Sequence, residues 1–82
     1  MFNGKSVLIT GGTGSFGRKY ARTLLDRYDL KRLVIFSRDE LKQFEMQQEL
    51  NGPAMRYFIG DVRDRVRLME AMRGIDYMIH AA

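Results

Sequence analysis

The fold is decided by residues 7–17, which read Val7-Leu8-Ile9-Thr10-Gly11-Gly12-Thr13-Gly14-Ser15-Phe16-Gly17. A short apolar run ends in a cluster of glycines, and a segment with helical spacing follows at once. This order predicts a strand, a tight turn and a helix whose N-terminus faces the turn. Because a helix N-terminus offers unpaired N–H groups and the positive end of a dipole, the stretch predicts a phosphate-binding turn.

The glycines fit two spacings. Gly12, Gly14 and Gly17 match G-x-G-x-x-G, whereas Gly11, Gly14 and Gly17 match G-x-x-G-x-x-G. In such turns one glycine reverses the chain, one lets the backbone approach a pyrophosphate, and one lets the helix pack closely on the strand. No Gly-Lys-Ser/Thr follows, which disfavours a Walker-type loop, so residues further along the chain must identify the ligand.

Length and composition limit the classes of protein. The chain has 82 residues, of which 45% are hydrophobic and 29% charged, as is usual for one small globular domain. It has no cysteine and one histidine, His80, which excludes disulfide frameworks and sites built from several cysteines or histidines. No apolar run approaches the roughly 20 residues of a membrane helix, and residues 1–5 lack the apolar core of a signal peptide. We therefore expect a cytoplasmic protein with no membrane partner.

The basic charge does not indicate a nucleic-acid partner. Fourteen basic and ten acidic residues give a formal net charge of +4. The basic residues are scattered, and many stand beside an acidic one, as in Arg38-Asp39-Glu40. This pattern is typical of solvated helix faces, and no motif with base-stacking aromatics accompanies it.

Strands and helices are expected to alternate along the whole chain. Apolar runs predict strands over residues 5–10, 32–37, 55–59 and 75–79, and helical spacing predicts helices over residues 15–27, 39–50 and 64–73. Short connections between alternating elements imply a parallel sheet with right-handed crossovers. The predicted fold is therefore α/β, a Rossmann-type doubly wound sheet of four strands in the order 3-2-1-4 with three helices.

The apolar positions of the second and third helices are also assigned. Leu41, Phe44 and Met46 are the predicted apolar stripe of the helix over residues 39–50, whereas one face of the next helix should hold Val66, Met69 and Met72. The fourth strand reads as buried, although the order 3-2-1-4 leaves it at an edge. We therefore expect residues 1–82 to be the N-terminal part of an NAD(P)-binding Rossmann domain in a chain of several hundred residues, with the remainder of the domain and a substrate domain beyond it.

The end of the second strand favours NADP over NAD. NAD-binding sheets usually place Asp or Glu about 20 residues beyond the glycines, where it binds the ribose 2′-hydroxyl. Here Ser37 stands 20 positions after Gly17, and Arg38 follows it. A hydroxyl and a guanidinium bind a 2′-phosphate by charge-assisted hydrogen bonds, which a carboxylate would repel. Asp39 is interpreted as the cap of the following helix, and Arg38 also fits a solvated surface arginine.

Three other residues near the strand ends are interpreted as follows, two of them with alternatives left open. Asp61, after the third strand, fits either a helix N-cap or a hydrogen-bond acceptor for the adenine amino group. Lys42 fits either a second positive charge near the 2′-phosphate or a surface lysine. His80, at the end of the fourth strand, is interpreted as a packing residue beside the dinucleotide.

The chain resembles the extended short-chain dehydrogenase/reductase superfamily in Thr10–Gly17, Asp61-Val62 and His80-Ala81-Ala82. More narrowly, Ile9–Gly17, Phe36–Gln43 and Met55–Asp64 are similar to the inverting UDP-N-acetylglucosamine 4,6-dehydratases. That branch opens the pseudaminic acid pathway, which glycosylates flagellin and other surface structures, and its relatives act in polysaccharide synthesis. The resemblance implies a homo-oligomer acting on a UDP-sugar. It also implies a tightly held NADP that accepts hydride from C4 and returns it to C6 with inversion at C5.

The resemblance also implies roles for single residues. Its catalytic Tyr-x-x-x-Lys pair has no match in residues 1–82, so no catalytic residue is assigned. The implied cofactor contacts are the pyrophosphate turn (Gly11, Thr13, Gly14, Ser15, Phe16 and Gly17), the 2′-phosphate site (Ser37, Arg38 and Lys42), the adenine site (Asp61 and Val62) and the path of the dinucleotide (Ala81 and Ala82). Two alternatives remain: another NADP-dependent nucleotide-sugar epimerase or reductase of the superfamily, or a module that senses NADP without turnover.

Overall fold

Four parallel strands form one sheet in the computed structural model, which describes residues 2–11 and 13–81. The strands are β1 (Ser6–Thr10), β2 (Arg32–Ser37), β3 (Met55–Ile59) and β4 (Tyr77–His80). They lie in the order β3-β2-β1-β4, and each neighbouring pair is parallel. The predicted order 3-2-1-4 is therefore confirmed.

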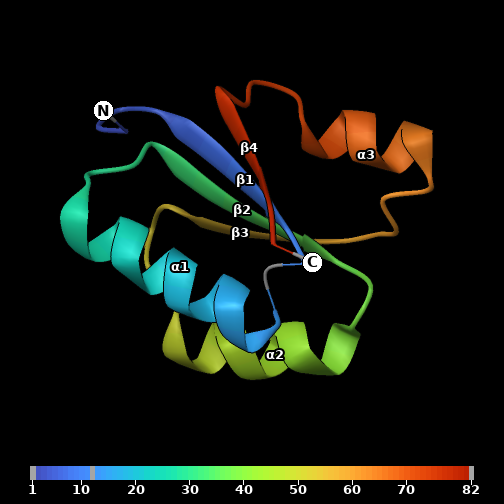
Figure 1. Ribbon diagram of the computed structural model, residues 1–82, viewed down its shortest axis with the longest axis horizontal. Coiled ribbons are helices and arrows are strands. Elements are labelled where there is room, and N and C mark those ends of the chain that lie inside the picture. Colours follow the sequence, from blue (N-terminus) through green and yellow to red (C-terminus); the bar gives the residue numbers. More distant parts are fainter. Residues whose placement is uncertain (1, 12, 82) are drawn as a thin grey trace.

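Helices cover both faces of this sheet (Figure 1). Helices α1 (Ser15–Arg27) and α2 (Glu40–Glu49) lie on one face, and α3 (Arg65–Ala71) lies on the other. Helix α3 changes face because its connection returns from β3, at one edge, past β2 and β1 to β4, and right-handed crossovers in opposite directions use opposite faces. This is the doubly wound, Rossmann-type arrangement that the sequence predicts.

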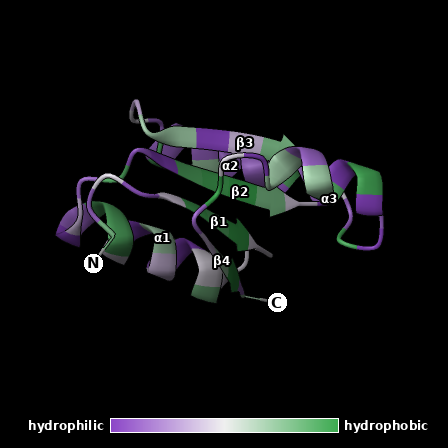
Figure 2. Ribbon diagram, turned by 90° about the horizontal axis from the view of Figure 1, so that it is seen from above, coloured by the Kyte–Doolittle hydropathy of each residue, from purple (hydrophilic) through white to green (hydrophobic). Residues whose placement is uncertain are grey.

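The core has two parts, one on each face of the sheet. Val7 and Ile9 belong to the larger part, under α1 and α2, whereas Leu8 belongs to the smaller part, under α3. Successive side chains of β1 thus point to opposite faces, and both faces are covered, so the strand is apolar throughout. Figure 2 shows this concentration of hydrophobic residues in β1 and β2.

The boundaries of α3 and β4 differ from the prediction. The helix expected over residues 64–73 spans Arg65–Ala71, and the strand expected over residues 75–79 spans Tyr77–His80. Asp76 explains the later start of the strand. Its N–H donates to the Ser6 carbonyl and its Oδ2 accepts from the Ser6 N–H, both at 2.8 Å, so a carboxylate takes the place of a strand partner there.

The apolar stripe predicted for α2 is confirmed at Met46 and wrong at Leu41 and Phe44. Leu41 and Phe44 are 67% and 61% exposed, whereas Met46 and Gln43 face the sheet and are buried. The inward face is set by the start of the helix, where Asp39 caps the first turn and Gln43 bonds to the end of β2. Hydrophobic spacing alone gives no sign of a polar residue that is buried because a strand end satisfies it.

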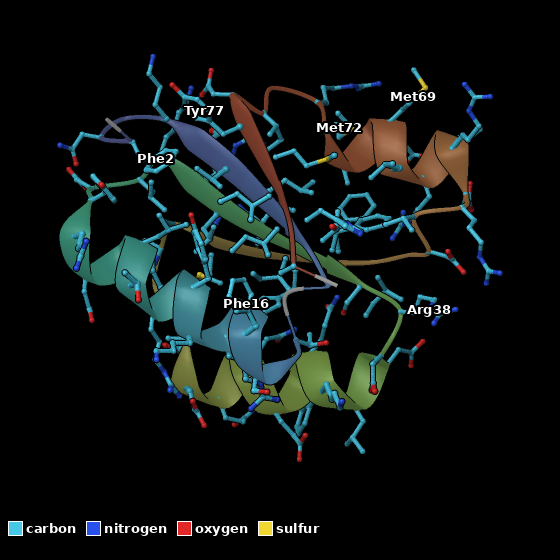
Figure 3. The ribbon with its side chains drawn as sticks, in the orientation of Figure 1. Phe2, Phe16, Arg38, Met69, Met72 and Tyr77 are labelled. Atoms are coloured by element: carbon cyan, nitrogen blue, oxygen red, sulfur yellow. The ribbon has the colours of Figure 1, made fainter. Side chains whose placement is uncertain are left out.

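The face of α3 that holds the predicted apolar residues points away from the sheet. Val66, Met69 and Met72 are all exposed, and Figure 3 shows Met69 pointing outward from this helix and Met72 at its C-terminal end. Leu68 and Ala71 pack on the sheet instead. Strand β4 is an edge strand, as expected, and its Tyr77 and Met78 are exposed.

Candidate functional site

The glycine turn leaves the end of β1 and is tied to β2. Gly11 has a φ of +68°, which strongly favours glycine, and its N–H donates to the Phe36 carbonyl at 3.0 Å. The Gly14 N–H then returns to the Gly11 carbonyl at 3.3 Å. The turn is therefore held by backbone contacts before any ligand binds.

The fold itself does not require a glycine at position 14. The Gly14 φ of −71° and ψ of 169° suit any residue, and among the described residues an added Cβ would meet the Gly11 carbonyl alone, at an ordinary 3.7 Å. The side of the turn that a Cβ would occupy is thus a cradle with room for a ligand to approach the backbone. Glycine at this position therefore fits the dinucleotide that the sequence predicts.

The first turn of α1 suits an anion. Its N-cap, Gly14, provides no side-chain cap, and this turn contains no acidic residue. By contrast, Asp39 caps α2 and Asp64 caps α3. Since free N–H groups and the helix dipole attract negative charge, α1 is the helix here whose start is left open to a phosphate.

The other residues predicted for this turn have different exposures. Thr13 and Gly17 are buried, whereas Ser15 and Phe16 are exposed. Figure 3 shows Phe16 near the start of α1. Ser15 and Phe16 can therefore reach a ligand with their side chains, whereas Thr13 and Gly17 shape the turn.

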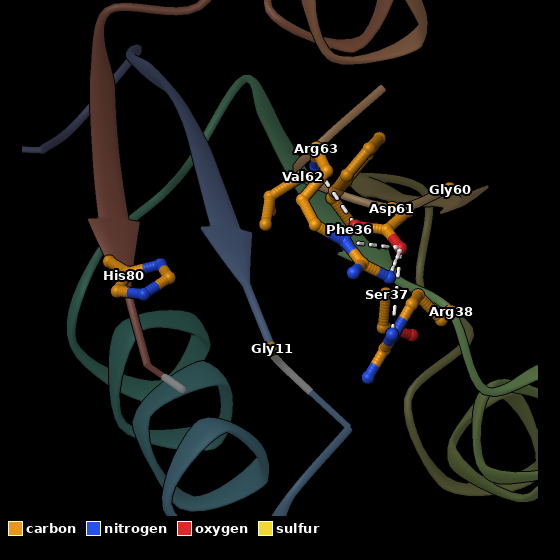
Figure 4. Close-up of a pocket in the computed structure, with 9 residues that line it drawn as sticks. All are labelled: Gly11, Phe36, Ser37, Arg38, Gly60, Asp61, Val62, Arg63 and His80. Atoms are coloured by element: carbon orange, nitrogen blue, oxygen red, sulfur yellow. Dashed lines mark hydrogen bonds and ion pairs between the residues drawn. The ribbon is translucent and has the colours of Figure 1, made fainter. Parts of the chain in front are cut away.

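A cavity of about 390 Å³ lies at the C-terminal ends of the strands (Figure 4). It brings together five residues predicted from two strand ends and the glycine turn: Gly11, Ser37, Arg38, Asp61 and Val62. Its other lining residues are Phe36, Gly60, Arg63 and His80. Lys42 is exposed in the first turn of α2, outside this lining. Ala81 follows β4, and the predicted contact at Ala82 lies outside the described residues.

The Gln43 side chain contacts Ser37 from helix α2. This residue was not identified from the sequence. Ser37 is 8% exposed, and its Oγ accepts from the Gln43 side-chain amide at 2.9 Å. The same amide donates to the Phe58 carbonyl at 3.0 Å. Gln43 thereby joins the end of β2 to β3 under the cavity.

Three charged side chains gather at the rim. Asp61 Oδ2 lies 3.5 Å from Arg38 and 2.7 Å from Arg63, as the dashed lines in Figure 4 show. The Arg63 hydrogen bonds, and then the charges of Arg63 and Arg38, hold the pKa of the Asp61 carboxyl well below its usual range. The same pairing raises the pKa of Arg63. Asp61 is thus ionised at neutral pH, and the cluster keeps a net positive charge.

Asp61 does not cap α3. The cap is Asp64, whose Oδ1 accepts from the Arg67 N–H at 3.1 Å. Asp61 instead accepts from the Arg63 N–H at 2.9 Å, within the turn that precedes the helix. Of the two alternatives open for Asp61, the helix cap is therefore wrong.

Gly60 brings the third strand end close to the floor of the cavity. A Cβ there would lie 2.7 Å from Cζ of Phe36 and 2.8 Å from Cγ of Arg67. The Phe36 ring stacks on Phe58 at 5.9 Å, and the Arg67 guanidinium lies 4.0 Å from the centre of the Phe58 ring. Gly60 is therefore required by packing, unlike Gly14.

Arg18 connects the glycine turn to α2. Its Nε donates to the Thr13 carbonyl at 3.1 Å, and a terminal nitrogen donates to the Lys42 carbonyl at 3.3 Å. The sequence indicated only a solvated face for this arginine. Its contacts show that it positions the turn.

His80 is anchored at the opposite side of the cavity. Its Nδ1 lies 2.5 Å from Thr10 Oγ1, and the Ala81 N–H donates to the Thr10 carbonyl at 2.9 Å. No group of three or more His, Cys, Asp or Glu residues within residues 2–11 and 13–81 is arranged to bind a metal ion. Across the same residues, no helix has the length and apolar character to span a membrane.

The sheet order and the glycine turn together define the Rossmann-type class of folds. The chain belongs to the polysaccharide biosynthesis protein family, whose model matches residues 7–82. It is 62% identical over 82 residues to the inverting UDP-N-acetylglucosamine 4,6-dehydratase of Campylobacter jejuni, and 48% identical over 85 aligned positions to a UDP-glucose 4-epimerase of Rickettsia akari. Both alignments cover 100% of this chain and 25% of the relative. The chain thus spans about a quarter of the length of these relatives, and the predicted resemblance to the dehydratase is confirmed.

Solved structures agree with the fold. Pen from Bacillus thuringiensis superposes with a TM-score of 0.93 at 40% identity, over 100% of this chain and 26% of that one. Two more distant structures carry a dinucleotide and show the fold alone. A short-chain dehydrogenase/reductase of Veillonella parvula is in complex with NADP. It superposes with a TM-score of 0.78 at 21% identity, over 95% of this chain and 35% of that one. The dTDP-glucose 4,6-dehydratase of Bacillus anthracis is in complex with NAD. It superposes with a TM-score of 0.78 at 15% identity, over 95% of this chain and 26% of that one.

Proposed function

We propose that this chain is the N-terminal, NADP-binding part of a UDP-N-acetylglucosamine 4,6-dehydratase that inverts C5. The observation that carries the cofactor is the pair Ser37 and Arg38 in the cavity at the end of β2. The reaction is supported by the 62% identity to the Campylobacter jejuni dehydratase along the whole chain. The remainder of the Rossmann domain, the substrate domain and the catalytic residues then belong to a longer protein.

The glycine turn and the start of α1 would bind the pyrophosphate. The open side of Gly14 lets the backbone approach the phosphates, and the uncapped first turn of α1 offers N–H donors to them. Gly11, Thr13, Ser15, Phe16 and Gly17 complete this turn. Once bound, NADP supplies the chemistry of accepting and returning hydride, while these residues hold and orient it.

The 2′-phosphate would bind between Ser37 and Arg38. The nearest carboxylate in the sequence, Asp39, is occupied as a helix cap, since its Oδ1 accepts from the Lys42 N–H at 3.0 Å. The Arg38 side chain is 70% exposed, and its 3.5 Å pair with Asp61 leaves its other guanidinium donors to a ligand. A guanidinium and a hydroxyl, with the Lys42 ammonium close by in sequence, favour a phosphate over a neutral ribose hydroxyl.

Asp61 and Val62 would flank the adenine. Because Asp61 is ionised, it accepts hydrogen bonds only, which suits the donating adenine amino group. Val62 is exposed and lines the same cavity, so it offers an apolar contact to the base. Ala81 and Ala82 would lie along the dinucleotide at the end of β4.

The family resemblance also suggests a pathway, a cellular location and an oligomeric state for the parent protein. We place the parent protein in pseudaminic acid biosynthesis, for the glycosylation of flagellin and other surface structures, as a cytoplasmic homo-oligomer that acts on a UDP-sugar. A second candidate is a UDP-sugar 4-epimerase, which the 48% identity to the Rickettsia akari protein favours.

Product analysis with the full-length protein distinguishes these reactions. The dehydratase converts UDP-N-acetylglucosamine to a product lighter by one water, and NMR shows inversion at C5. An epimerase gives an isomer of unchanged mass, which would refute the dehydratase. Mass spectrometry of the cofactor released from the purified protein should find NADP, and NAD alone would refute the 2′-phosphate site. NADP without turnover of UDP-sugars would support a sensing module instead.

A further inference from the structure

Gln43 is a polar side chain buried under the cavity. It is 2% exposed, although it belongs to the surface helix α2. Its Nε2 lies 2.9 Å from Ser37 Oγ, 3.0 Å from the Phe58 carbonyl and 3.4 Å from the Ser37 carbonyl. An amide nitrogen has two hydrogens, so the two shorter contacts use both of them.

This contact limits what the Ser37 hydroxyl can do. An oxygen that accepts from Gln43 still carries one hydrogen, which it can donate to another group. Within the described residues, the hydrogen bonds of Ser37 Oγ consist of the one from Gln43, so its own hydrogen is available to a ligand. Ser37 lines the cavity and is therefore presented to that ligand as a donor.

The two nicotinamide dinucleotides differ in what they ask of this position. At neutral pH a 2′-phosphate offers mainly acceptor oxygens, whereas a ribose 2′-hydroxyl both donates and accepts. A hydroxyl held as a donor makes a charge-assisted bond to the phosphate. A hydroxyl that rotates freely serves either partner.

We propose that Gln43 is a specificity-determining positioning residue, whose side-chain amide holds the Ser37 hydroxyl as a donor and so favours a 2′-phosphorylated dinucleotide over one with a free 2′-hydroxyl. The inference rests on the NADP site proposed above and names a residue that acts through Ser37. It places part of the cofactor selectivity in a side chain that does not line the cavity.

The test compares dissociation constants in the full-length protein. Isothermal titration with NADP and with NAD is run on the wild type, on Gln43→Met and on Gln47→Met. Methionine has a similar length and no donor, and Gln47 is exposed on the same helix. We expect Gln43→Met to lower the ratio of the NAD to the NADP dissociation constant roughly fivefold to tenfold. Gln47→Met should leave the ratio unchanged, and an unchanged ratio in Gln43→Met overturns the proposal.

A double-mutant cycle shows whether Gln43 acts through Ser37. In a Ser37→Ala background, adding Gln43→Met should change the ratio no further, because the hydroxyl it positions is gone. A second, independent drop in the ratio overturns the proposal. A purely structural role of Gln43 would weaken both dinucleotides alike and leave the ratio where it was.

A measurement on the wild type covers the case in which Gln43→Met does not fold. NADP should shift the NMR signals of the Gln43 side-chain amide more than NAD does, and equal shifts overturn the proposal. A wild type that binds neither dinucleotide overturns the proposed function and this inference with it. A wild type that prefers NADP independently of Gln43 overturns the inference alone.

Discussion

An Arg38→Ala substitution should separate the binding of NADP from that of NAD. A hydrogen bond between charged groups contributes about 1.5–3 kcal/mol. In the free protein Arg38 already faces Asp61 at 3.5 Å, and its side chain is 70% exposed. Such an exposed pair contributes at most about 1 kcal/mol, and solvent screens the phosphate contact as well. We therefore expect a loss of about 1–2 kcal/mol, which is roughly a fivefold to thirtyfold weaker affinity for NADP.

Calorimetric titration of the full-length protein with both dinucleotides measures this difference. The affinity for NAD should stay within about twofold, because NAD has no phosphate for Arg38 to bind. Arg27→Ala, at the far end of α1, is the matched control and should change neither affinity. Equal losses for NADP and NAD, or no loss for either, would refute the assignment of Arg38 to the 2′-phosphate.

Three further substitutions test other parts of the site. Gly14→Val should abolish binding of both dinucleotides and leave the thermal unfolding cooperative, because within residues 2–11 and 13–81 its Cβ would meet just the Gly11 carbonyl at 3.7 Å; retained binding would mean that no ligand approaches this turn. Asp61→Asn should make the free energy of unfolding fall less steeply as the pH is lowered. The lowered pKa of Asp61 stabilises the fold above about pH 4, and this contribution disappears as the pH falls, so wild-type unfolding followed by circular dichroism should show the steeper decline. Gly60→Ala should lower the free energy of unfolding in urea by about 1–3 kcal/mol, since its Cβ would lie 2.7 Å from Phe36. Gly52→Ala is the control, because its Cβ would have no described residue within 4 Å, and equal effects would contradict the packing argument.

Local patterns in the sequence were sufficient for the framework of this protein. The apolar runs identified four strands, and their alternation with helical segments predicted the order that the sheet has. The run of glycines after β1 predicted the turn that joins β1 to α1, and Asp39 was correctly interpreted as a helix cap. These features depend on neighbours within about ten residues, whose spacing is visible along the chain.

Only the tertiary structure decided which side chains are buried and which ones contact each other. The stripe of Leu41 and Phe44 was assigned to the wrong side of α2, because hydrophobic spacing does not tell how a helix leaves its strand. Gln43 is buried since Ser37 and Phe58 satisfy its amide, and Asp61 is held by Arg38 and Arg63.

The glycine turn itself shows where the division lies. From the sequence, its glycines fitted two spacings, and which glycine had which role stayed open. In the structure, Gly11 is required by its positive φ, whereas neither the backbone of Gly14 nor its packing against the described residues requires glycine. Local spacing determined that a glycine turn joins β1 to α1. The three-dimensional surroundings of each glycine decided which one has open space beside it, because free space depends on residues distant in sequence.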